Sequence, residues 1–283
     1  MEFINSKKLL LDAKKNGYAI PAFNFYNMET LQSIIRGCEF LKSPVILAIS
    51  PSSIEYCGKD YILGLANSAM KKSTIPMVFH LDHHENIDDL KESIDLGFKS
   101  IMIDGSKLNL EKNIALVKEI TDYAHLKGVT VEAELGRVVM TNDLEKLEGE
   151  EFFTNVKESI KFVNETNIDS LAISIGTAHG LYIKEPKLNF QRLKEIKSSV
   201  DLPLVLHGAS GINEKDIRKS IALGINKINI ATELKVPFTN AIKNYLFKNP
   251  NCIDLRKYVP YGKEAICNVV KEKIILCNSY NRI

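Results

Sequence analysis

Met77-Val-Phe-His-Leu-Asp-His-His84 is an apolar run that ends in three histidines and one aspartate within five residues. A β-strand that ends in such polar side chains is typical of α/β barrels and open α/β sheets, which keep their chemistry at the C-terminal ends of their strands. A lone histidine more often packs or caps than binds a ligand, but a cluster favours a site. His179 and His207 also follow short β-branched runs, which would bring histidines from three strands to face one another across the mouth of a barrel.

The rest of the chain repeats the pattern of a short apolar strand followed by an amphipathic helix. The expected strands span residues 18–24, 45–49, 77–81, 100–103, 130–133, 170–175, 204–206 and 227–230. Eight such units without an antiparallel hairpin signal predict a closed (β/α)8 TIM barrel, with an open doubly wound sheet as the alternative. A helix over residues 6–16 precedes the first strand. An extra helix over residues 258–277 follows the last unit, and its apolar face packs either on its own barrel or on a second subunit.

The composition is that of an ordinary globular protein, and we expect residues 1–283 to form one domain. Of the 283 residues, 45% are hydrophobic and 25% charged, and the net charge of +2 gives no strong field for nucleic acid or an anionic membrane. The sequence shows neither a secretory leader nor a run of about 18 apolar residues, so we expect a cytoplasmic protein. The five cysteines include no C-x-x-C pair, which indicates reduced thiols rather than disulfides or a cysteine zinc site.

Polar side chains gather at the expected C-terminal ends of the strands, and all are expected to face the same rim. They are Asn24, Ser50, Asp82 with His83, Asp104, Glu132 with Glu134, His179, His207 and Asn229. Three imidazoles that leave one coordination position open are the usual ligands of catalytic zinc, and nearby carboxylates orient them or transfer protons. The residue pattern does not decide whether His80, His83 or His84 is the ligand from the third strand.

Two segments on the same rim are candidate phosphate sites. Gly208-Ala-Ser-Gly211 precedes the expected start of a helix, and Asn229-Ile-Ala-Thr232 follows the eighth strand. Both offer backbone N–H groups near a helix N-terminus, and the loops after strands seven and eight are the customary phosphate site of this fold. Each segment taken singly is equally well explained as a simple turn. Together they favour a phosphorylated ligand.

Seven segments in the same order resemble the class II, zinc-dependent ketose-bisphosphate aldolases over residues 6–282. They are Pro21-Ala-Phe-Asn24, His80-Leu-Asp-His-His84, Met102-Ile-Asp-Gly-Ser106, Val131-Glu-Ala-Glu-Leu-Gly136, Gly176-Thr-Ala-His-Gly180, Leu206-His-Gly-Ala-Ser-Gly211 and Asn229-Ile-Ala-Thr-Glu-Leu234. The His-Leu-Asp-His-His run and the tail Cys277-Asn-Ser-Tyr-Asn-Arg282 are most similar to tagatose-bisphosphate aldolases within this family.

The resemblance implies a role for each matching position. It makes His83, His179 and His207 the zinc ligands and Asp82 the catalytic acid/base, and it places Asp104 and Glu134 in the outer shell of the metal. The residues expected to hold substrate are Asn24, Ser50, Gly180, Gly208, Ser210, Asn229 and Thr232.

The implied reaction is the reversible cleavage of tagatose 1,6-bisphosphate to dihydroxyacetone phosphate and glyceraldehyde 3-phosphate. Fructose 1,6-bisphosphate is the alternative substrate. Zinc would polarise the carbonyl, and Asp82 would move the hydroxyl proton. The sixth strand has no lysine at its tip, which disfavours a Schiff-base aldolase. The resemblance also makes Na⁺ or K⁺ a candidate further cofactor and implies a homodimer or homotetramer, with an accessory subunit as an open question.

The loop after the fifth strand departs from the family pattern. Relatives usually carry Gly-Gly-x-Glu-Asp there, and that glutamate exchanges the proton on the triose carbanion. Here Asn142 takes the glutamate's place, and an amide cannot transfer that proton. Asp143 and Glu145 are the candidate replacements, and the alternative function is a catalytically weakened barrel that binds ligand. In addition, Ile183 replaces the lysine that follows the tyrosine in many fructose-specific relatives.

Overall fold

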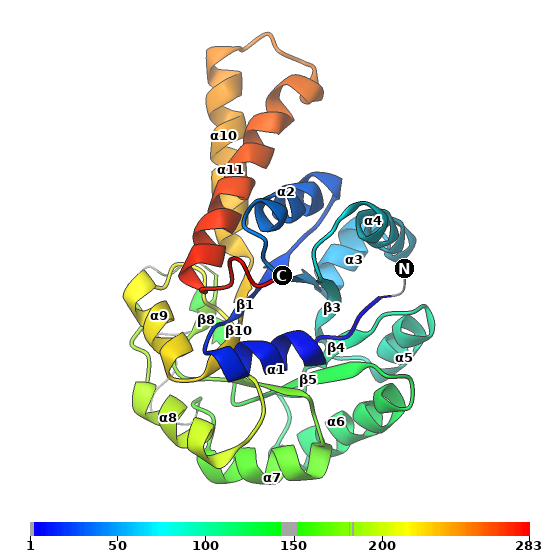
Figure 1. Cartoon of the computed structure of the whole chain (residues 1–283), viewed down its shortest axis with the longest axis vertical. Helices are drawn as coiled ribbons and strands as arrows, with labels where there is room; N and C mark the ends of the chain where they lie inside the picture. The colour runs from blue at the N-terminus through cyan, green and yellow to red at the C-terminus, as the bar shows by residue number, and fades with distance from the viewer. Residues whose placement is uncertain (1–2, 143–151, 181, 183) are drawn as a thin grey trace.

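The computed structural model describes residues 3–142, 152–180, 182 and 184–283, and its centre is a closed barrel of eight parallel strands (Figure 1). The order around the barrel is β1-β10-β9-β7-β5-β4-β3-β2, so the first and last strands in sequence pair and close it. The strands are β1 (Ile20–Asn24), β2 (Val45–Ile49), β3 (Met77–His84), β4 (Ser100–Ile103), β5 (Thr130–Leu135), β7 (Ser170–Ile173), β9 (Leu204–Leu206) and β10 (Ile225–Ile230). The predicted TIM barrel is confirmed, and the open sheet is excluded.

Helices cover the outside of the barrel in the order that a (β/α)8 fold requires (Figure 1). They are α1 (Lys7–Asn16), α2 (Met28–Phe40), α3 (Pro51–Cys57), α4 (Lys59–Lys72), α5 (Ile87–Asp95), α6 (Leu110–His125), α7 (Val156–Thr166), α8 (Phe190–Ser199), α9 (Glu214–Ala222), α10 (Thr232–Lys248) and α11 (Leu255–Leu276). Asparagine side chains accept hydrogen bonds from backbone N–H groups at the start of several of them, such as α2 and α9, as the N-cap rule predicts.

The barrel interior holds an apolar cluster at its N-terminal end, beside a few buried polar side chains, and is polar at its C-terminal end. Because alternate residues of a strand share a face, Ile20, Ala22, Ile46 and Val78 fill the lower part. Leu10 and Ala13 of α1 pack on them and close that end, so the helix predicted over residues 6–16 is confirmed as a plug. The larger apolar cluster lies between the strands and the outer helices.

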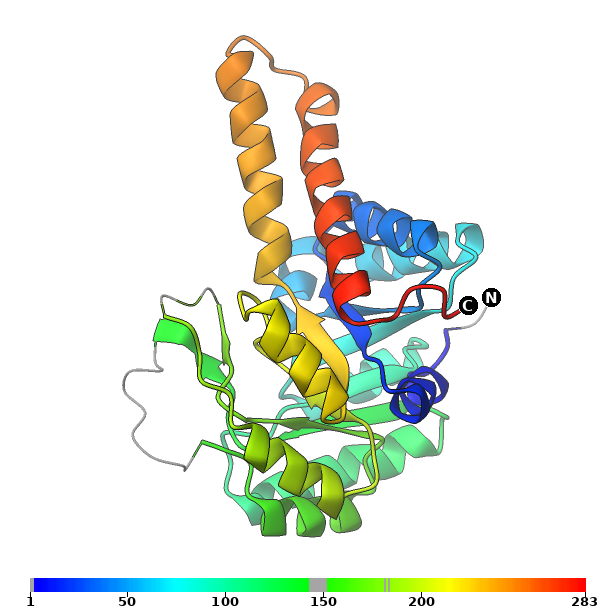
Figure 2. The same cartoon turned by 60° about the vertical axis from the view of Figure 1, so that its left-hand side comes forward.

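The last two helices form a hairpin, here called the helical arm, whose outer part projects beyond the barrel (Figures 1 and 2). The predicted C-terminal helix is thus α11, which packs along α10 and α2 of its own chain. The approach to α2 is close, because a Cβ added to Gly37 would lie 2.7 Å from Val270 Cγ1.

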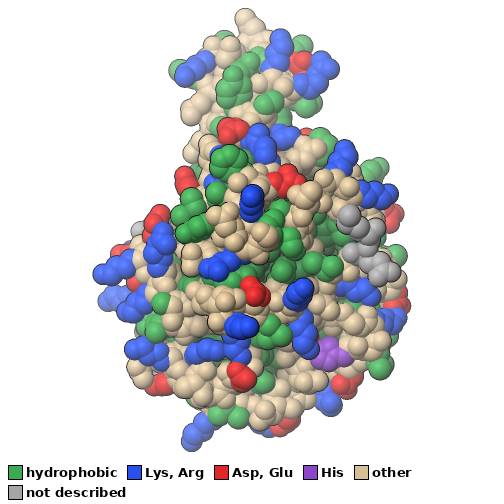
Figure 3. Space-filling view, viewed as in Figure 1, with side chains coloured by type: hydrophobic (Ala, Val, Ile, Leu, Met, Phe, Trp, Pro, Cys, Tyr) green, Lys and Arg blue, Asp and Glu red, His purple; other side chains and the backbone are tan. Residues whose placement is uncertain are grey.

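On the face seen in Figure 3, Lys and Arg side chains lie among acidic and apolar ones rather than in one block. None of the helices in the described part of the chain combines the length and apolar character that crossing a lipid bilayer requires.

Candidate active site

Three histidines from separate parts of the chain meet at the C-terminal rim of the barrel. His83 is the last but one residue of β3, His179 lies in the short strand β8 (Ala178–His179), and His207 follows β9. Their ring centroids are 4.5 Å apart for His83 and His207, 4.9 Å for His83 and His179, and 6.0 Å for His179 and His207. One nitrogen of each ring lies within 4.8 Å of the others, as a shared metal ion requires.

A backbone irregularity in β3 turns His83, rather than His80 or His84, toward the rim. Regular alternation along β3 points His80 and Asp82 into the barrel. The pairing of β3 with β4 then shifts register between Leu81 and His84, and His83 adopts a left-handed conformation with φ of 56°. Such a bulge re-aims a side chain, so two consecutive residues reach the site. His84 instead bonds Asp89 of α5 through Nδ1 at 3.0 Å.

Carboxylates fix which nitrogen of two histidines is free. Asp104 Oδ2 lies 2.8 Å from His83 Nδ1, and Glu132 Oε1 lies 3.0 Å from His207 Nε2. An ionised carboxylate only accepts, so these two nitrogens carry the hydrogens. The remaining nitrogens, His83 Nε2 and His207 Nδ1, face each other at 2.8 Å. These two nitrogens converge on one point where a metal ion would fit, and each of the two rings has the carboxylate partner that is usual for metal-bound histidine.

The charge around the histidines also favours a cation. Burial would lower the pKa of His83, but the negative charges of Asp82, Asp104 and Glu134 raise it to about 9. Burial and the charge of Asp104 raise the pKa of Glu134 to about 8. Glu134 Oε1 accepts the Val138 N–H at 3.0 Å, whereas its buried Oε2 has no hydrogen-bond partner among the described residues.

Asp82 is held beside the histidines as an anion. It is 3% exposed, and the side-chain amides of Asn229 and Asn24 donate to it at 3.0 Å and 3.4 Å. Burial alone would raise the pKa of the Asp82 carboxyl, but the charges of His83, His207 and Lys227 hold it well below its usual range. The carboxylate is therefore able to accept a proton from a bound hydroxyl.

The predicted phosphate and substrate residues line one cavity of about 790 Å³ together with His83, His179 and Asp82. They are Asn24, Ser50, Gly180, Gly208, Ser210, Asn229 and Thr232, and Asp104 lies on the same wall as His83. The glycines are required by space: a Cβ on Gly208 would lie 2.5 Å from the Ala178 carbonyl oxygen, and one on Gly180 would lie 2.6 Å from Thr141 Oγ1. Both have positive φ, which strains any other residue.

Several lining residues were not predicted. Lys107, Arg137 and Lys235 add cations to the cavity, and Tyr26 lies beneath Lys235, whose Nζ is 4.8 Å from the ring centroid. They come from loops and helix surfaces, where no periodic pattern marks them. Burial and the charge of Asp82 raise the pKa of the Tyr26 hydroxyl well above its usual range, so this hydroxyl stays protonated.

One rim prediction is wrong: Glu132 lies below the rim, inside the barrel. Alternation along β5 (Thr130–Leu135) points both Glu132 and Glu134 inward, and Glu132, nearer the start of the strand, bonds the buried Lys227 of β10. A sheet of two short strands, in which β6 (Val139–Met140) pairs with β8, was not predicted. Met140 is opposite His179, so the loop after β5 is bonded to the strand that carries a candidate ligand.

The loop positions singled out in the sequence are only partly described. Asn142 is exposed, two residues after β6. Asp143, Glu145 and Ile183 lie outside the described residues.

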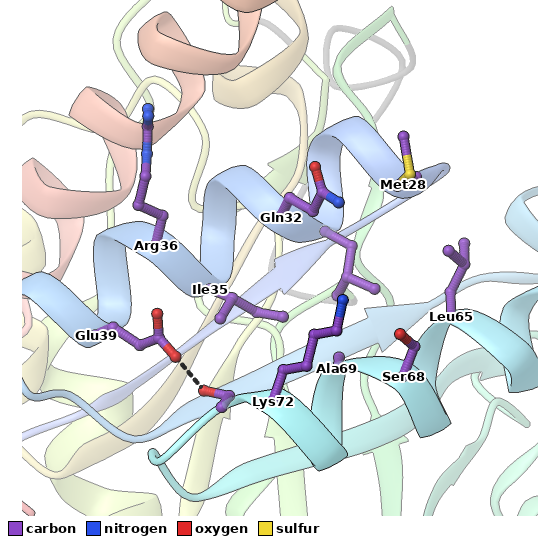
Figure 4. Close-up of a pocket in the computed structure, with 11 residues that line it drawn as sticks. Met28, Gln32, Ile35, Arg36, Glu39, Leu65, Ser68, Ala69 and Lys72 are labelled. Atoms are coloured by element: carbon purple, nitrogen blue, oxygen red, sulfur yellow. Dashed lines mark hydrogen bonds between the residues drawn. The ribbon is translucent and has the colours of Figure 1, made fainter.

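A second hollow lies on the outside of the barrel between α2 and α4 (Figure 4). Its floor contains Leu31, Ile35 and Leu65, and at one end the Ser73 hydroxyl donates to Glu39 at 2.6 Å. It contains no histidine or paired carboxylates, so it lacks the chemistry gathered at the rim.

The whole chain is similar to proteins of one family. The family described as fructose-bisphosphate aldolase class-II matches residues 4–282. The YdjI aldolase from Escherichia coli K12 has 34% sequence identity and a TM-score of 0.87, with 99% of each chain covered. A proposed fructose-1,6-bisphosphate aldolase from Coccidioides immitis has 30% identity and a TM-score of 0.86, covering 97% of this chain and 96% of that one. The fructose-bisphosphate aldolase of Campylobacter jejuni, at 22% identity and TM-score 0.83, shares the fold over 100% of this chain and 97% of its own.

Proposed function

The chain belongs to the class II fructose-bisphosphate aldolase family, and from that premise we propose that it uses zinc to cleave tagatose 1,6-bisphosphate reversibly into dihydroxyacetone phosphate and glyceraldehyde 3-phosphate. The family match confirms the resemblance seen in the sequence and the class of enzyme, a carbon–carbon lyase. The observation that carries the proposal is the convergence of His83 Nε2, His207 Nδ1 and a ring nitrogen of His179 on one point of the rim.

We propose that His83, His179 and His207 hold the zinc ion. Three imidazoles at the rim leave one coordination position of the metal open for substrate. The five free cysteines form no metal-binding group among the described residues. When bound, zinc supplies a Lewis acid that stabilises negative charge developing on the substrate carbonyl oxygen. Asp104 and Glu132 keep the histidines in the binding tautomer.

Asp82 acts on the sugar hydroxyl. In cleavage its carboxylate takes the proton from the C4 hydroxyl, the C3–C4 bond breaks, and the bond electrons move onto the triose half as C4 becomes the aldehyde carbon. The amides of Asn24 and Asn229 orient the carboxylate for this transfer. The triose half then needs a proton at C3 to leave as dihydroxyacetone phosphate.

The charges in the cavity suit a substrate with two phosphates. Gly208, Ser210 and Thr232 surround the N-terminal end of α10, where backbone N–H groups and the helix dipole favour an anion. Lys235 lies one turn further along this helix, and Arg137 contributes a second cation from the β5 loop. We assign the phosphate of the triose half to the α10 end of the cavity.

We expect both sugars to be cleaved, with tagatose 1,6-bisphosphate preferred. The sugars differ only at C4, so a preference comes from how the transition state holds that hydroxyl, where one misplaced hydrogen bond costs on the order of 1–3 kcal/mol, or one to two powers of ten in rate. Two sequence features support this choice: the tagatose-like run that ends at His84, and Ile183 in place of the lysine of many fructose-specific relatives. Triose phosphate release from each sugar, measured with zinc saturating, gives the two values of kcat/KM. A value about ten times higher for the fructose isomer would overturn the preference and leave the family unchanged.

Replacing Asn142 with glutamate should speed proton exchange at C3 of dihydroxyacetone phosphate. Asn142 stands where relatives have their proton-exchanging glutamate, and its exposed position beyond β6 leaves room for the longer side chain. Exchange of the triose C–H proton with deuterated water measures this step directly. If Asn142→Glu changes nothing while Asp143→Ala or Glu145→Ala stops exchange, one of those acids performs the step. If none of the three variants alters exchange, the weakened ligand-binding barrel is the better description.

We further propose that the chain forms one domain, works in the cytoplasm and assembles as a homodimer or homotetramer. The free cysteines suit a reducing compartment.

Phe247 and Ile253 on the helical arm are 88% and 94% exposed, which suits contact with another copy. Sedimentation equilibrium measures the assembly, and a cleavage assay with the purified chain alone tests the need for an accessory subunit. Activity with and without Na⁺ or K⁺ tests a monovalent cation as a further cofactor.

A further inference from the structure

Lys227 of β10 is a lysine buried completely inside the barrel, below the cavity. Its Nζ donates to both carboxylate oxygens of Glu132, at 2.7 and 2.8 Å, and lies 3.2 Å from His80 Nε2. An ammonium group has three hydrogens and no lone pair, so these three acceptors satisfy it fully. A buried charge without such partners would be very costly, and the arrangement is therefore specific.

The Glu132 carboxylate is held from several strands at once. Besides the bonds from Lys227, its Oε1 accepts from His207 Nε2 at 3.0 Å, and its Oε2 accepts from the Ser170 hydroxyl of β7 at 3.2 Å. The side-chain nitrogen of Asn229 lies 3.3 Å from His207 Nδ1, the position of a donor toward a lone pair. Glu132 thus sets which nitrogen of His207 carries the hydrogen.

The chain of contacts continues downward from Lys227. Because the ammonium only donates, His80 Nε2 accepts and His80 Nδ1 carries its hydrogen, which it donates to Ser100 Oγ at 2.9 Å. Ser100 contacts Ser6, the residue that precedes α1, at 3.3 Å. Lys227 therefore sits at the centre of a polar column that runs from the rim to the plug helix.

We infer that Lys227 is a positioning residue for the metal site: its ammonium clamps Glu132, and Glu132 presents His207 with Nδ1 free toward the metal. This inference rests on the proposed zinc function only for its last step. The ion pair between Lys227 and Glu132 and the His207 tautomer are properties of the metal-free protein. A lysine in this place has no contact with the cavity and does not touch substrate.

The direct test is the His207 tautomer in metal-free Lys227→Met, read from the ring ¹⁵N chemical shifts. Methionine fills similar space without a charge, so the Glu132 carboxylate loses the two hydrogen bonds from Lys227. Glu132 is then no longer held in place as the acceptor for His207 Nε2. We expect wild type to show Nε2–H alone and the variant to show both tautomers. Zinc affinity, measured by competition with a chelator, should fall about 10- to 100-fold, as is usual when the partner of a ligand is lost.

Ser170→Ala is the matched control, because it removes another bond to the same carboxylate but leaves the ammonium in place. It should keep the single tautomer and zinc affinity close to wild type. If Ser170→Ala and Lys227→Met lost zinc affinity and the single His207 tautomer to the same extent, general repacking would explain the effect. That result would overturn the inference.

Leaving Glu132 unpaired could prevent folding of Lys227→Met, so a double variant, Lys227→Met with Glu132→Gln, provides a second measurement. It removes the whole ion pair and leaves no lone charge. The free amide should give mixed His207 tautomers and weaker zinc binding. A double variant with Nε2–H alone and wild-type zinc affinity would overturn the inference. If wild-type protein bound no zinc, the proposed function would fail, while the tautomer measurement would still decide the role of Lys227.

Discussion

Asp82→Ala should lower kcat by about 10²- to 10⁴-fold, the usual contribution of a positioned acid or base, while KM changes little. The side chain lies next to His83 but is not one of the three proposed zinc ligands, so one zinc per chain should remain. Its contacts are with Asn24 and Asn229, which are placed to orient it toward substrate. Steady-state cleavage kinetics with metal analysis on the same sample measure both expectations.

Asp82→Asn is the control for shape, because it keeps the size of the side chain and removes the proton acceptor. It should be nearly as inactive as Asp82→Ala. If either variant cleaves at close to the wild-type rate, another carboxylate performs the transfer. Glu134 is then the candidate, because it lies near His83 and Asp104. Glu132 is excluded from that role by its position below the rim.

His179→Ala should abolish zinc binding and lower activity about 10³-fold or more, since a Lewis acid contributes several kcal/mol to the reaction. His83→Ala and His207→Ala should do the same. A chelator should remove activity from the wild-type enzyme, and added zinc should restore it, while the circular dichroism of the barrel stays unchanged because the apolar core does not depend on the site.

His125→Ala provides the control for loss of an imidazole. His125 ends α6 and bonds Asp169, which precedes β7, at 2.9 Å, so it lies at the opposite end of the barrel from the three candidate ligands. This variant should keep zinc and activity. A His179→Ala enzyme with full zinc occupancy and activity would contradict the assignment of three histidines as the zinc ligands, because the remaining two imidazoles cannot form the proposed site.

The barrel was predictable because its signal is local and repeated. Strands such as β2 (Val45–Ile49) are buried on both faces and so read as continuous apolar runs, and glycine or asparagine marks the helix ends. The choice of His83 was not predictable from residue types, because it depends on a bulge that forms only when β3 pairs with β4. The resemblance supplied this choice where periodicity could not.

Features that depend on distant partners were missed for the same reason. Lys227 reads as a surface residue within a short strand, and only the position of Glu132, far away in sequence, makes its burial possible. The strands β6 and β8 have two residues each, too few for any periodic pattern. Glu132 and Glu134 look equivalent in sequence, and only their depth in the barrel separates their roles.

The pairing of β6 with β8 has a practical consequence for redesign. Met140 is hydrogen-bonded opposite His179, and the side chain of Thr141 occupies the space that Gly180 leaves. A loop transplanted alone from a relative would therefore disturb a candidate ligand. Residues 137–142 and 176–180 are therefore one structural unit. Sugar preference is best re-engineered by exchanging both segments together.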